Sequence, residues 1–501
     1  MTKPISILNH VLGPIMRGPS SSHSAGSLRI GRLCRDLLGG NVSAIDCEYD
    51  PNGSLVTTHL SQGSDMGLTG GLLGWSANDE RLPAYRKHAR DAGLRFDVHT
   101  IDYGAGHPNT YRLQVCNGDE HHVVTAVSVG GGMIEVTDID GMTVSLEGDQ
   151  HVLIAFTADG SPIGIRCSTQ PFQANAVDTL KAETGAVIVR QLQPVVPVCG
   201  DETTQVPFRN ASQMLSFDGD RNSSLPRLAL EYEAARSGMS HDQVRQHVAQ
   251  VLATMQTSLR VGRAGTRYAD RILSSQVGRY QAAENEGVLI GGSTFNQVVT
   301  SVTSVLEAKS AMEVIVAAPT AGSCGVLPGA LLGVGTTMNA SDELLIDTLL
   351  AAGLIGMFIA DGATFAAEEG GCMAECGSAS GMSAAALVVL ANGSTRQALA
   401  AASQALQNSF GMTCDTVANR VEAPCLGKNT MAATNAIAAA NMALAGFDHL
   451  IPIDEVIIAM ARVGRQMPRE LCCTGLGGIA ICPSSKAIEA QLEARASQHR
   501  D

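Results

Sequence analysis

Residues 368–377 read Glu-Glu-Gly-Gly-Cys-Met-Ala-Glu-Cys-Gly, and the chain is organised around this stretch. Two later segments, Gly-Met-Thr-Cys-Asp at 411–415 and Glu-Ala-Pro-Cys at 422–425, add Cys414 and Cys425. Glycines on both sides of Cys372 let the backbone come close to a bulky group. Three thiolates without a fourth beside them suit an iron–sulfur cluster that keeps one iron open. An open metal position is typical of a catalytic site, whereas structural zinc takes four ligands.

These cysteines have a second interpretation. A free cysteine is most often a small, buried, hydrophobic residue. Long gaps between cysteines carry little information by themselves. On spacing alone, packing is therefore favoured over metal binding, and the neighbouring sequence has to decide between them.

The apolar spacing after residue 226 is that of amphipathic helices. The many small residues in these helices predict a bundle whose axes approach closely. The cysteines lie in loops and helix starts between the helices, so positions far apart in sequence can converge. Earlier in the chain, strand-like alternation is mixed with helical patterns. The predicted fold class is α+β, with an N-terminal mixed α/β domain followed by a C-terminal all-α catalytic domain.

Four segments are predicted within the 501 residues. Residues 1–146 form the mixed α/β domain, in which residues 53–58 are among the predicted strands. Residues 147–200 form a small βαβ-like segment. Residues 201–225 contain several prolines and polar residues and are interpreted as a linker. Residues 226–501 form the helical domain.

Composition limits the class of protein. Hydrophobic residues make up 45% and charged residues 16%, as in a folded globular protein. The net charge is −14 without a basic run, which argues against binding to nucleic acid or anionic membranes. Thirteen cysteines without a secretory leader indicate the reducing cytoplasm. Polar residues interrupt the apolar runs near 344–360 and 430–447, so we expect buried helices and no membrane span.

An N-terminal segment, Gly-Pro-Ser-Ser-Ser-His-Ser at 18–24, precedes a predicted helix from Ser24 to Leu38. Its serines are good N-cap residues. Free hydroxyls ahead of a helix N-terminus also suit a carboxylate ligand. Plain capping explains one serine but not three serines and His23, so both interpretations stay open.

Two further loops carry polar residues between glycines and prolines. His107 lies in the turn Gly-His-Pro-Asn-Thr at 106–110, where it is exposed for a polar role. Ala-Pro-Thr-Ala-Gly-Ser-Cys-Gly at 318–325 precedes a predicted helix. Its amides, with Thr320 and Ser323, could receive a carboxylate. The alternative for this loop is an ordinary helix-entry turn.

The flanking sequence resembles the oxygen-sensitive iron–sulfur L-serine dehydratases, also called L-serine ammonia-lyases. The segments that carry the resemblance are 318–325, 369–382, 414–425 and 474–480, with 18–24 similar to the other signature of that family. In that family, three cysteines at this spacing hold a 4Fe–4S cluster. The resemblance implies that Cys372, Cys414 and Cys425 are the metal ligands, whereas Cys376 and Cys324 are packing residues.

The implied reaction converts L-serine to pyruvate and ammonia, in amino-acid catabolism and gluconeogenesis. An open iron would act as a Lewis acid on the substrate while a side chain takes the α-proton. Elimination on threonine or cysteine and a non-catalytic iron–sulfur sensor are the alternatives. A pyridoxal-phosphate route would need a Schiff-base lysine, for which Lys428 lies in the most suitable turn. A positive charge near the cluster explains Lys428 equally well.

The resemblance also implies contacts with the substrate. The expected substrate-binding residues are Ser20, Ser21, Ser22, Ser24, Asn109, Thr110, Thr320 and Ser323. The catalytic residues are expected among His23, His59 and His107. Relatives commonly have Gly-His-Gly-Thr-Asp where this chain has Ser-Gln-Gly-Ser-Asp at 61–65. Gln62 stands at the position of the expected base and cannot take a proton. His59 is the expected substitute, although on a strand it would lie about 10 Å away and on the opposite face.

The last features concern closure of the metal site and assembly. Relatives have an Arg-Glu pair before the 474–480 segment, where this chain has Cys472 and Cys473. Some relatives close the open iron with a cysteine at the chain end. Here that role is left unassigned among Cys472, Cys473 and Cys482. We expect a homodimer whose ligand is a small amino acid.

Overall fold

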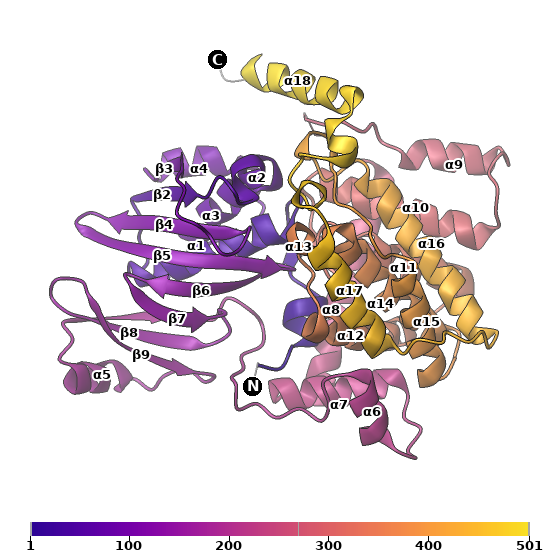
Figure 1. Cartoon of the computed structure of the whole chain (residues 1–501), viewed down its shortest axis with the longest axis horizontal. Coiled ribbons are helices and arrows are strands. Elements are labelled where there is room, and N and C mark those ends of the chain that lie inside the picture. The colour runs from indigo at the N-terminus through magenta and orange to yellow at the C-terminus, as the bar shows by residue number, and fades with distance from the viewer. Residues whose placement is uncertain (1–2, 269, 499–501) are drawn as a thin grey trace. The chain divides into compact units, whose positions relative to one another are not determined.

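A computed structural model describes residues 3–268 and 270–498. The chain forms two compact units. The sheet unit comprises Met1–Lys3 and Ser22–Thr204, and the helical unit comprises Pro4–Ser21 and Gln205–Asp501. The ribbon in Figure 1 shows strands in the first unit and mostly helices in the second. The predicted α+β class is confirmed.

The sheet unit is built on a six-stranded sheet of order β3-β2-β4-β5-β6-β7. Strands β2 and β3 run parallel, and the other neighbouring pairs are antiparallel. Apolar and polar residues alternate along β4, so that Tyr111, Leu113 and Val115 point to one face of the strand and are fully buried. The strands are β2 (Ala44–Tyr49), β3 (Arg95–Thr100), β4 (Thr110–Asn117), β5 (Glu120–Gly130), β6 (Met133–Ile139) and β7 (Met142–Leu146).

Short helices accompany this sheet. They are η2 (Ser21–Ala25), α1 (Gly26–Leu37), α2 (Leu55–Gln62), α3 (Ser64–Leu72), η3 (Leu82–Ala84) and α4 (Tyr85–Asp91). α1 and α3 pack closely because glycines face the contact. A Cβ atom on Gly31 would lie 2.6 Å from the carbonyl oxygen of Leu68. The small residues of α3 are therefore required by the packing of these two helices.

The predicted strand at 53–58 is wrong, because helix α2 covers this region. Ser54 adopts helical backbone angles, and Gly63 ends the helix in the left-handed region at φ 95°. The β-branched residues that suggested a strand are accommodated in the helix. Thr58 donates its hydroxyl back to the carbonyl of Ser54 at 2.7 Å. This correction changes the relation between His59 and Gln62, described below.

A second, three-stranded sheet has the order β10-β8-β9, with antiparallel pairs. Its elements are β8 (His151–Phe156), β9 (Pro162–Ser168), α5 (Ala176–Thr184) and β10 (Ile188–Leu192). Strand β8 is buried on both faces. Ile154 and Phe156 join the main core of the sheet unit, whereas Leu153 packs with Leu180 of α5. The segment predicted at 147–200 is thus a ββαβ element fixed to the core of its unit.

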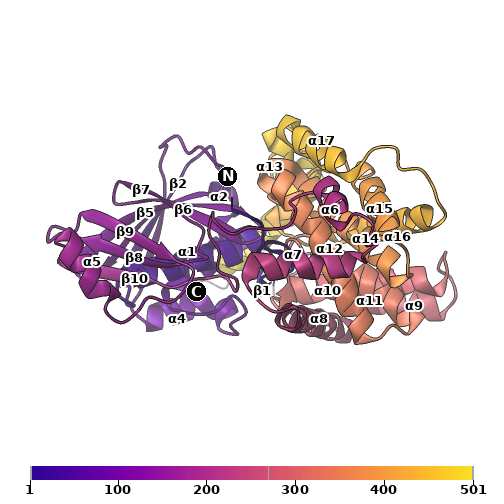
Figure 2. The same ribbon diagram turned by 90° about the horizontal axis from the view of Figure 1, so that it is seen from below.

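The helical unit contains most of the α-helices. They are α6 (Ala211–Asp218), α7 (Leu225–Ser237), α8 (His241–Ala264), α9 (Val277–Asn285), α10 (Ser293–Ser310), α11 (Val326–Met338), α12 (Asp342–Gly362), α13 (Ala367–Cys372), α14 (Ser378–Leu390), α15 (Thr395–Gln407), α16 (Cys425–Leu444), α17 (Ile453–Gln466) and α18 (Pro483–Gln498). Figure 2 shows α14 among α12, α15 and α16, against which it packs. α14 is alanine-rich and almost wholly buried, as the prediction of a close-packed bundle requires.

Shorter elements complete this unit. They are η1 (Ile7–Val11), β1 (Ile15–Met16), β11 (Ile315–Val316), η4 (Met373–Gly377), η5 (Val417–Asn419), η6 (Arg469–Leu471) and η7 (Gly478–Ile481). Helix α6 lies inside the predicted linker 201–225. It forms because Asn210 caps it and the Asp454 carboxylate accepts the amides of Ala211 and Ser212, at 2.9 Å each.

The N-terminal segment departs from the predicted domain boundary at residue 146. Residues 4–21 belong to the helical unit, because β1 pairs with β11 and η1 packs on α12. Glu233 of α7 holds η1 through the hydroxyl of Ser6 at 2.6 Å and the amide of Ile7 at 2.8 Å. Burial raises the pKa of this carboxyl to about 7.

Glu233 should make the helical unit less stable as pH rises. The folded state holds the Glu233 proton more tightly than the unfolded state, so stability is lost between pH 4.5 and about 7. The full loss is about 3 kcal/mol. The Glu233→Gln variant mimics the protonated acid, so its advantage over the wild type should be larger at pH 8 than at pH 5. Thermal midpoints of both proteins at these two pH values measure this difference, and an equal gap at both pH values would contradict it.

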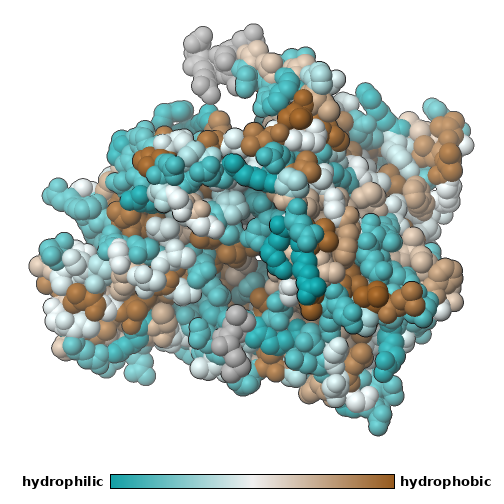
Figure 3. All heavy atoms as spheres, viewed as in Figure 1, coloured by the Kyte–Doolittle hydropathy of each residue, from teal (hydrophilic) through white to brown (hydrophobic). Residues whose placement is uncertain are grey.

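Two helical stretches, Asp342–Gly362 and Ala367–Leu390, are long and apolar enough to cross a membrane. Their most apolar windows are 78% and 89% buried inside the fold. Such burial is the pattern of core helices, as predicted for the first apolar run. On the face seen in Figure 3, hydrophilic residues cover much of the surface and hydrophobic residues are scattered among them.

Candidate metal centre in the helical unit

The backbone of the cysteine stretch breaks at Gly371. This residue has φ 60° and ψ −164°, so the chain turns sharply inside the last turn of α13, just before Cys372. The amide of Met373 then donates to the carbonyl of Met412 at 2.9 Å. This hydrogen bond fixes the loop that carries Cys414 beside Cys372. Glycine is favoured at 371 because a residue with a Cβ atom rarely adopts this conformation.

Cys372, Glu375 and Cys414 form a candidate metal site. One ligand atom from each side chain lies within 4.8 Å of the other two. Cys372 and Cys414 are buried, and both pack with Cys473 and Ala367. Thiolates are soft ligands that select iron–sulfur clusters, zinc or copper over calcium and magnesium. The donor set therefore fits an iron–sulfur group.

Cys425 and Cys376 lie close to this trio. Cys425 is the first residue of α16, is buried, and interacts electrostatically with Cys372. Cys376 is hydrogen-bonded to Cys372 and receives the side-chain amide of Asn429 at 3.5 Å. Cys324 is buried in its own loop, where burial raises the pKa of its thiol to about 12. The structure thus brings the three predicted ligands into one region and adds Cys376 to it.

Hydrogen bonds make Cys372 the thiolate of the group. Bonds from Cys376 and Cys414 hold the pKa of Cys372 well below its ordinary value. The same bonds raise the pKa of Cys376 and of Cys414 well above the ordinary thiol range. Because the thiolate is the form that binds metal, we expect Cys372 to bind the metal before the other cysteines do.

Two lysines supply positive charge at this centre. Lys428 donates to the carbonyl of Thr413 and to the carboxylate of Asp415. Burial alone would lower the pKa of Lys428, but the negative charges of Cys372 and Asp415 outweigh burial and raise it. Lys309 is fully buried and donates to the carbonyl of Val421. These cations lower the cost of burying several thiolates together.

The predicted substrate loop 318–325 contacts the same centre. Thr320 donates its hydroxyl to the Glu375 carboxyl at 2.6 Å and lies 3.0 Å from the Ser323 hydroxyl. The Ser21 hydroxyl accepts the amide of Ala321 at 3.2 Å. The pairing of β1 with β11 brings these two loops together. Ser20 is half-buried in the same N-terminal segment of the helical unit.

Glu375 is the functional candidate that the sequence interpretation missed. Its carboxyl lies between the thiols and Thr320, and burial followed by the charge of Cys372 raises its pKa to about 8. A carboxyl in this state is protonated at neutral pH and can donate a proton. Its position between Cys372 and Cys376 was the available signal, because an acidic residue within the apolar, small-residue run 370–382 is unusual.

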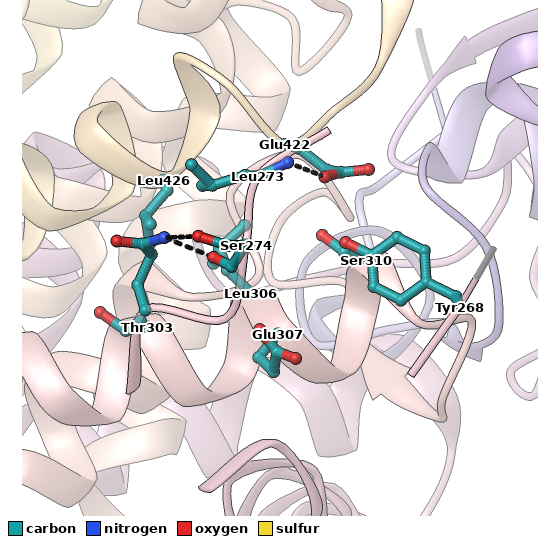
Figure 4. Close-up of a pocket in the computed structure, with 10 residues that line it drawn as sticks. Tyr268, Leu273, Ser274, Thr303, Leu306, Glu307, Ser310, Glu422 and Leu426 are labelled. Atoms are coloured by element: carbon teal, nitrogen blue, oxygen red, sulfur yellow. Dashed lines mark hydrogen bonds between the residues drawn. The ribbon is translucent and has the colours of Figure 1, made fainter. Parts of the chain in front are cut away.

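A pocket in the helical unit adjoins the segment that leads to Cys425. It is lined by Tyr268, Thr303, Glu307, Glu422 and Leu426, among others (Figure 4). Glu422 accepts the amides of Ile272 and Leu273 at 3.2 and 3.1 Å. Glu307 accepts the Thr266 hydroxyl at 2.7 Å and pairs with Arg271. These contacts fasten Thr266 and residues 271–273 to α10 and to the loop before Cys425.

The remaining predicted residues belong to the sheet unit. His23 is fully buried, and its Nε2 lies 2.8 Å from the hydroxyl of Thr58. Burial, with a smaller contribution from His59, lowers the pKa of His23 to about 3. His23 is therefore neutral at physiological pH and is a weak base.

His59 and Gln62 lie three residues apart on helix α2, so their side chains are neighbours on one helix face. The expected separation on opposite faces of a strand is wrong. His59 Nδ1 lies 2.7 Å from a carboxylate oxygen of Asp65. A histidine held by a carboxylate in this way resembles an oriented general base. Gln62 is buried, and its carbonyl accepts the Ser24 hydroxyl at 3.0 Å.

The turn 106–110 is fixed to the start of α2. The His107 Nδ1 accepts the amide of Asn109 at 3.1 Å, and the Thr110 hydroxyl donates to the His107 carbonyl at 2.8 Å. Asn109 is buried and receives the hydroxyl of Ser54. The carbonyl of Ser22 accepts the Ser128 hydroxyl at 2.9 Å. The structure thus groups the histidines and Asn109 around α2.

Comparison with known proteins gives matches along nearly all of the chain. A family model described as serine dehydratase alpha chain matches residues 220–480. A probable L-serine dehydratase alpha chain of Bacillus subtilis is 35% identical over 285 residues, 57% of this chain and 95% of that relative. The probable beta chain of the same organism is 32% identical over 167 residues, 33% of this chain and 75% of its own.

One relative matches across both units. The L-serine dehydratase of Haemophilus influenzae is 30% identical over 485 residues, which cover 93% of this chain and 96% of the relative. The alpha-type and beta-type regions of two-chain relatives therefore lie on a single chain here, as they do in that protein.

Proposed function

The chain belongs to the serine dehydratase family, whose members are lyases, and we propose that it converts L-serine to pyruvate and ammonia. The observation that carries the proposal is the meeting of Cys372, Glu375 and Cys414 inside the segment that the family model matches. We further propose that the group held there is a 4Fe–4S cluster with Cys372, Cys414 and Cys425 as its protein ligands. Three thiolates leave one iron without a protein ligand.

The reaction has two chemical obstacles. Hydroxide is a poor leaving group, and the α-proton of serine is only weakly acidic. When bound, the cluster would supply a Lewis acid for the β-hydroxyl and the carboxylate of serine. Thr320 and Ser323 offer hydroxyls to the substrate carboxylate. Glu375, whose pKa is raised to about 8, can give its proton to the departing hydroxide. The enamine that remains tautomerises to an imine, and water then releases ammonia and pyruvate.

The pyridoxal-phosphate route is disfavoured by the surroundings of Lys428. Its ammonium is paired with Asp415 and its pKa is raised, so it is held in the charged form. A Schiff base needs a neutral amine. This supports the interpretation of Lys428 as a counter-charge for the cysteine site.

We propose His59 as the general base, because Asp65 orients it and it neighbours Gln62 on α2. His59→Ala should lower the rate of serine turnover by roughly 100- to 10,000-fold, the usual contribution of general base catalysis. Asp65→Asn should lower it less, because the histidine remains. Anaerobic steady-state assays measure both variants. Normal turnover by His59→Ala would exclude this base, and His107 is then the next candidate.

The substrate is tested by an anaerobic keto-acid assay on reconstituted protein with serine, threonine and cysteine. Pyruvate from serine at the highest kcat/KM supports the proposal. Sulfide from cysteine at a higher kcat/KM would assign a desulfidase, and no turnover with an intact cluster would favour a sensor.

We also propose that the protein is a cytoplasmic homodimer whose ligand is a free amino acid. Light scattering of the loaded protein tests whether it is a dimer.

A further inference from the structure

We propose that Asn429 is a positioning residue for the reaction. Its side chain fixes the loop 318–325, which offers hydroxyls to the substrate carboxylate, to the start of the helix that carries Cys425. This inference rests on the proposed function. Asn429 lies on α16, one turn after Cys425, and is fully buried. Its carboxamide contacts both the loop and the cysteine group, so one side chain joins the two.

The carboxamide of Asn429 is hydrogen-bonded at both ends. Its Oδ1 accepts the amide of Gly325 at 3.1 Å. Its Nδ2 donates to the carbonyls of Gly322 at 2.8 Å and Cys425 at 2.9 Å. The opposite orientation of the carboxamide would set its N–H groups against the Gly325 amide and its oxygen against two carbonyls, so these partners determine the orientation. Asn429 therefore holds the loop at two points, Gly322 and Gly325.

The same side chain reaches the thiols. Nδ2 of Asn429 donates to Sγ of Cys376 at 3.5 Å, and the thiol of Cys376 is hydrogen-bonded to Cys372. Because the Cys376 sulfur accepts from the carboxamide, the hydrogen of its thiol is free to point toward Cys372. Asn429 is thus next to two predicted metal ligands, to Cys425 directly and to Cys372 through Cys376.

The loop that Asn429 holds also lies against Glu375. A Cβ atom on Gly322 would be 2.5 Å from one carboxyl oxygen of Glu375 and 2.7 Å from the other. The Thr320 hydroxyl donates to the same carboxyl at 2.6 Å. A shift of Gly322 would therefore move both Thr320 and the backbone against which Glu375 lies. Loss of the Asn429 contacts should misplace the substrate-binding hydroxyls and the proposed proton donor relative to each other.

Asn435 provides a matched control on the same helix. Its Nδ2 donates to the Ser380 hydroxyl and to the Ala405 carbonyl, each at 2.9 Å, and its Oδ1 accepts the side-chain amide of Asn408 at 2.8 Å. These three partners lie on α14, on α15 and directly after α15, and none of them belongs to the loop. Replacement of Asn435 therefore removes a comparable set of hydrogen bonds without disturbing the loop.

The first experiment compares Asn429→Ala with Asn435→Ala in the loaded enzyme under anaerobic conditions. Bound iron, kcat and KM for serine are measured for both. At equal iron content, Asn429→Ala should lower kcat/KM about 100-fold, the scale of a reacting group misplaced by about 1 Å. KM should rise and kcat should fall, because the loop serves both the substrate carboxylate and Glu375. Asn435→Ala should keep the kcat/KM of the wild type.

Asn429→Ser is the milder variant, which keeps the experiment informative if Asn429→Ala does not fold. A serine hydroxyl on a helix can bond back to the carbonyl four residues earlier, here that of Cys425. It is too short to reach Gly322 and Gly325. Asn429→Ser should therefore lower kcat/KM in the same direction as Asn429→Ala while it retains iron.

The second experiment needs no cluster. Hydrogen exchange of the backbone amides in residues 319–326 is followed by mass spectrometry in the metal-free, full-length protein. Asn429→Ala and Asn429→Ser should speed exchange there by at least about 10-fold, because the hydrogen bonds that close the loop are lost. Asn435→Ala should leave exchange in this segment unchanged.

Two outcomes would overturn the inference. One is an equal kcat/KM in the Asn429 variants and in Asn435→Ala. The other is unchanged exchange of residues 319–326 in the Asn429 variants. In either case the wild type would still dehydrate serine, so the proposed function would stand. If the wild type itself does not turn over serine, the proposed function fails, and the exchange experiment still shows whether Asn429 holds the loop.

Discussion

Replacement of Cys372 by serine is expected to abolish iron binding and to lower serine turnover by at least about 1,000-fold, the scale of losing a Lewis acid. Cys372 is the thiol whose pKa is lowered by two hydrogen bonds, from Cys376 and Cys414. It is also the first cysteine after the break at Gly371. The substitution removes this thiolate and leaves only Glu375 and Cys414 of the three side chains that form the candidate metal site.

The matched variants are Cys376→Ala and Cys482→Ser, measured anaerobically for iron, sulfide and activity. Cys482 is exposed, so its replacement should change nothing. Cys376 contacts Cys372 and Asn429, and its replacement should retain the cluster because Cys376 is predicted to pack rather than bind metal. Loss of iron in Cys376→Ala together with retention in Cys372→Ser would reverse the ligand assignment.

Replacement of Gly371 by alanine is expected to lower iron affinity by at least about 10- to 100-fold, as loss of support around a metal ligand does. A Cβ atom at residue 371 would lie 2.7 Å from the carbonyl oxygen of Met412 and 2.6 Å from Met467 Cε. The Met412 carbonyl accepts the amide of Met373, so its displacement would move the Cys414 loop away from Cys372.

Gly411→Ala is the control for this experiment. Gly411 also has a positive φ, of 77°, but a Cβ atom there meets nothing within 4 Å. Both variants therefore strain the backbone, and only Gly371→Ala crowds the Cys414 loop. Anaerobic iron titration should show a larger loss of iron affinity in Gly371→Ala than in Gly411→Ala. Equal losses of affinity would show that backbone strain, rather than the contact with Met412, explains the effect.

The cysteine stretches and the helical character of the second half could be predicted because local sequence determines both. Which thiols meet depends on long-range backbone contacts, such as those of Cys414 with Leu471 and Cys473. These contacts have no signature in sequence spacing. For the same reason, Cys473 could not be distinguished from Cys472 by position alone.

The errors have identifiable physical causes. The run that includes Val56, Thr57 and Thr58 has the β-branched residues of a strand, but the threonine hydroxyls of α2 bond back to the helix carbonyls. Residues 4–21 precede the sheet unit in the sequence, but a two-residue pairing and Glu233 fix them to the helices, and neither contact has a local sequence signal. The role of a buried charge such as Lys309 could not be predicted from the sequence, because it depends on which thiols lie near the lysine in the folded chain.

The most direct test of the central claim is the rate of pyruvate formation from serine as a function of bound cluster in one anaerobic preparation. The protein is treated with a chelator, and iron and sulfide are then restored in steps. The account predicts no pyruvate from the stripped protein and a rate that rises in proportion to bound iron, up to about four irons per chain. Full activity in the stripped protein, or activity restored by pyridoxal phosphate alone, would contradict it.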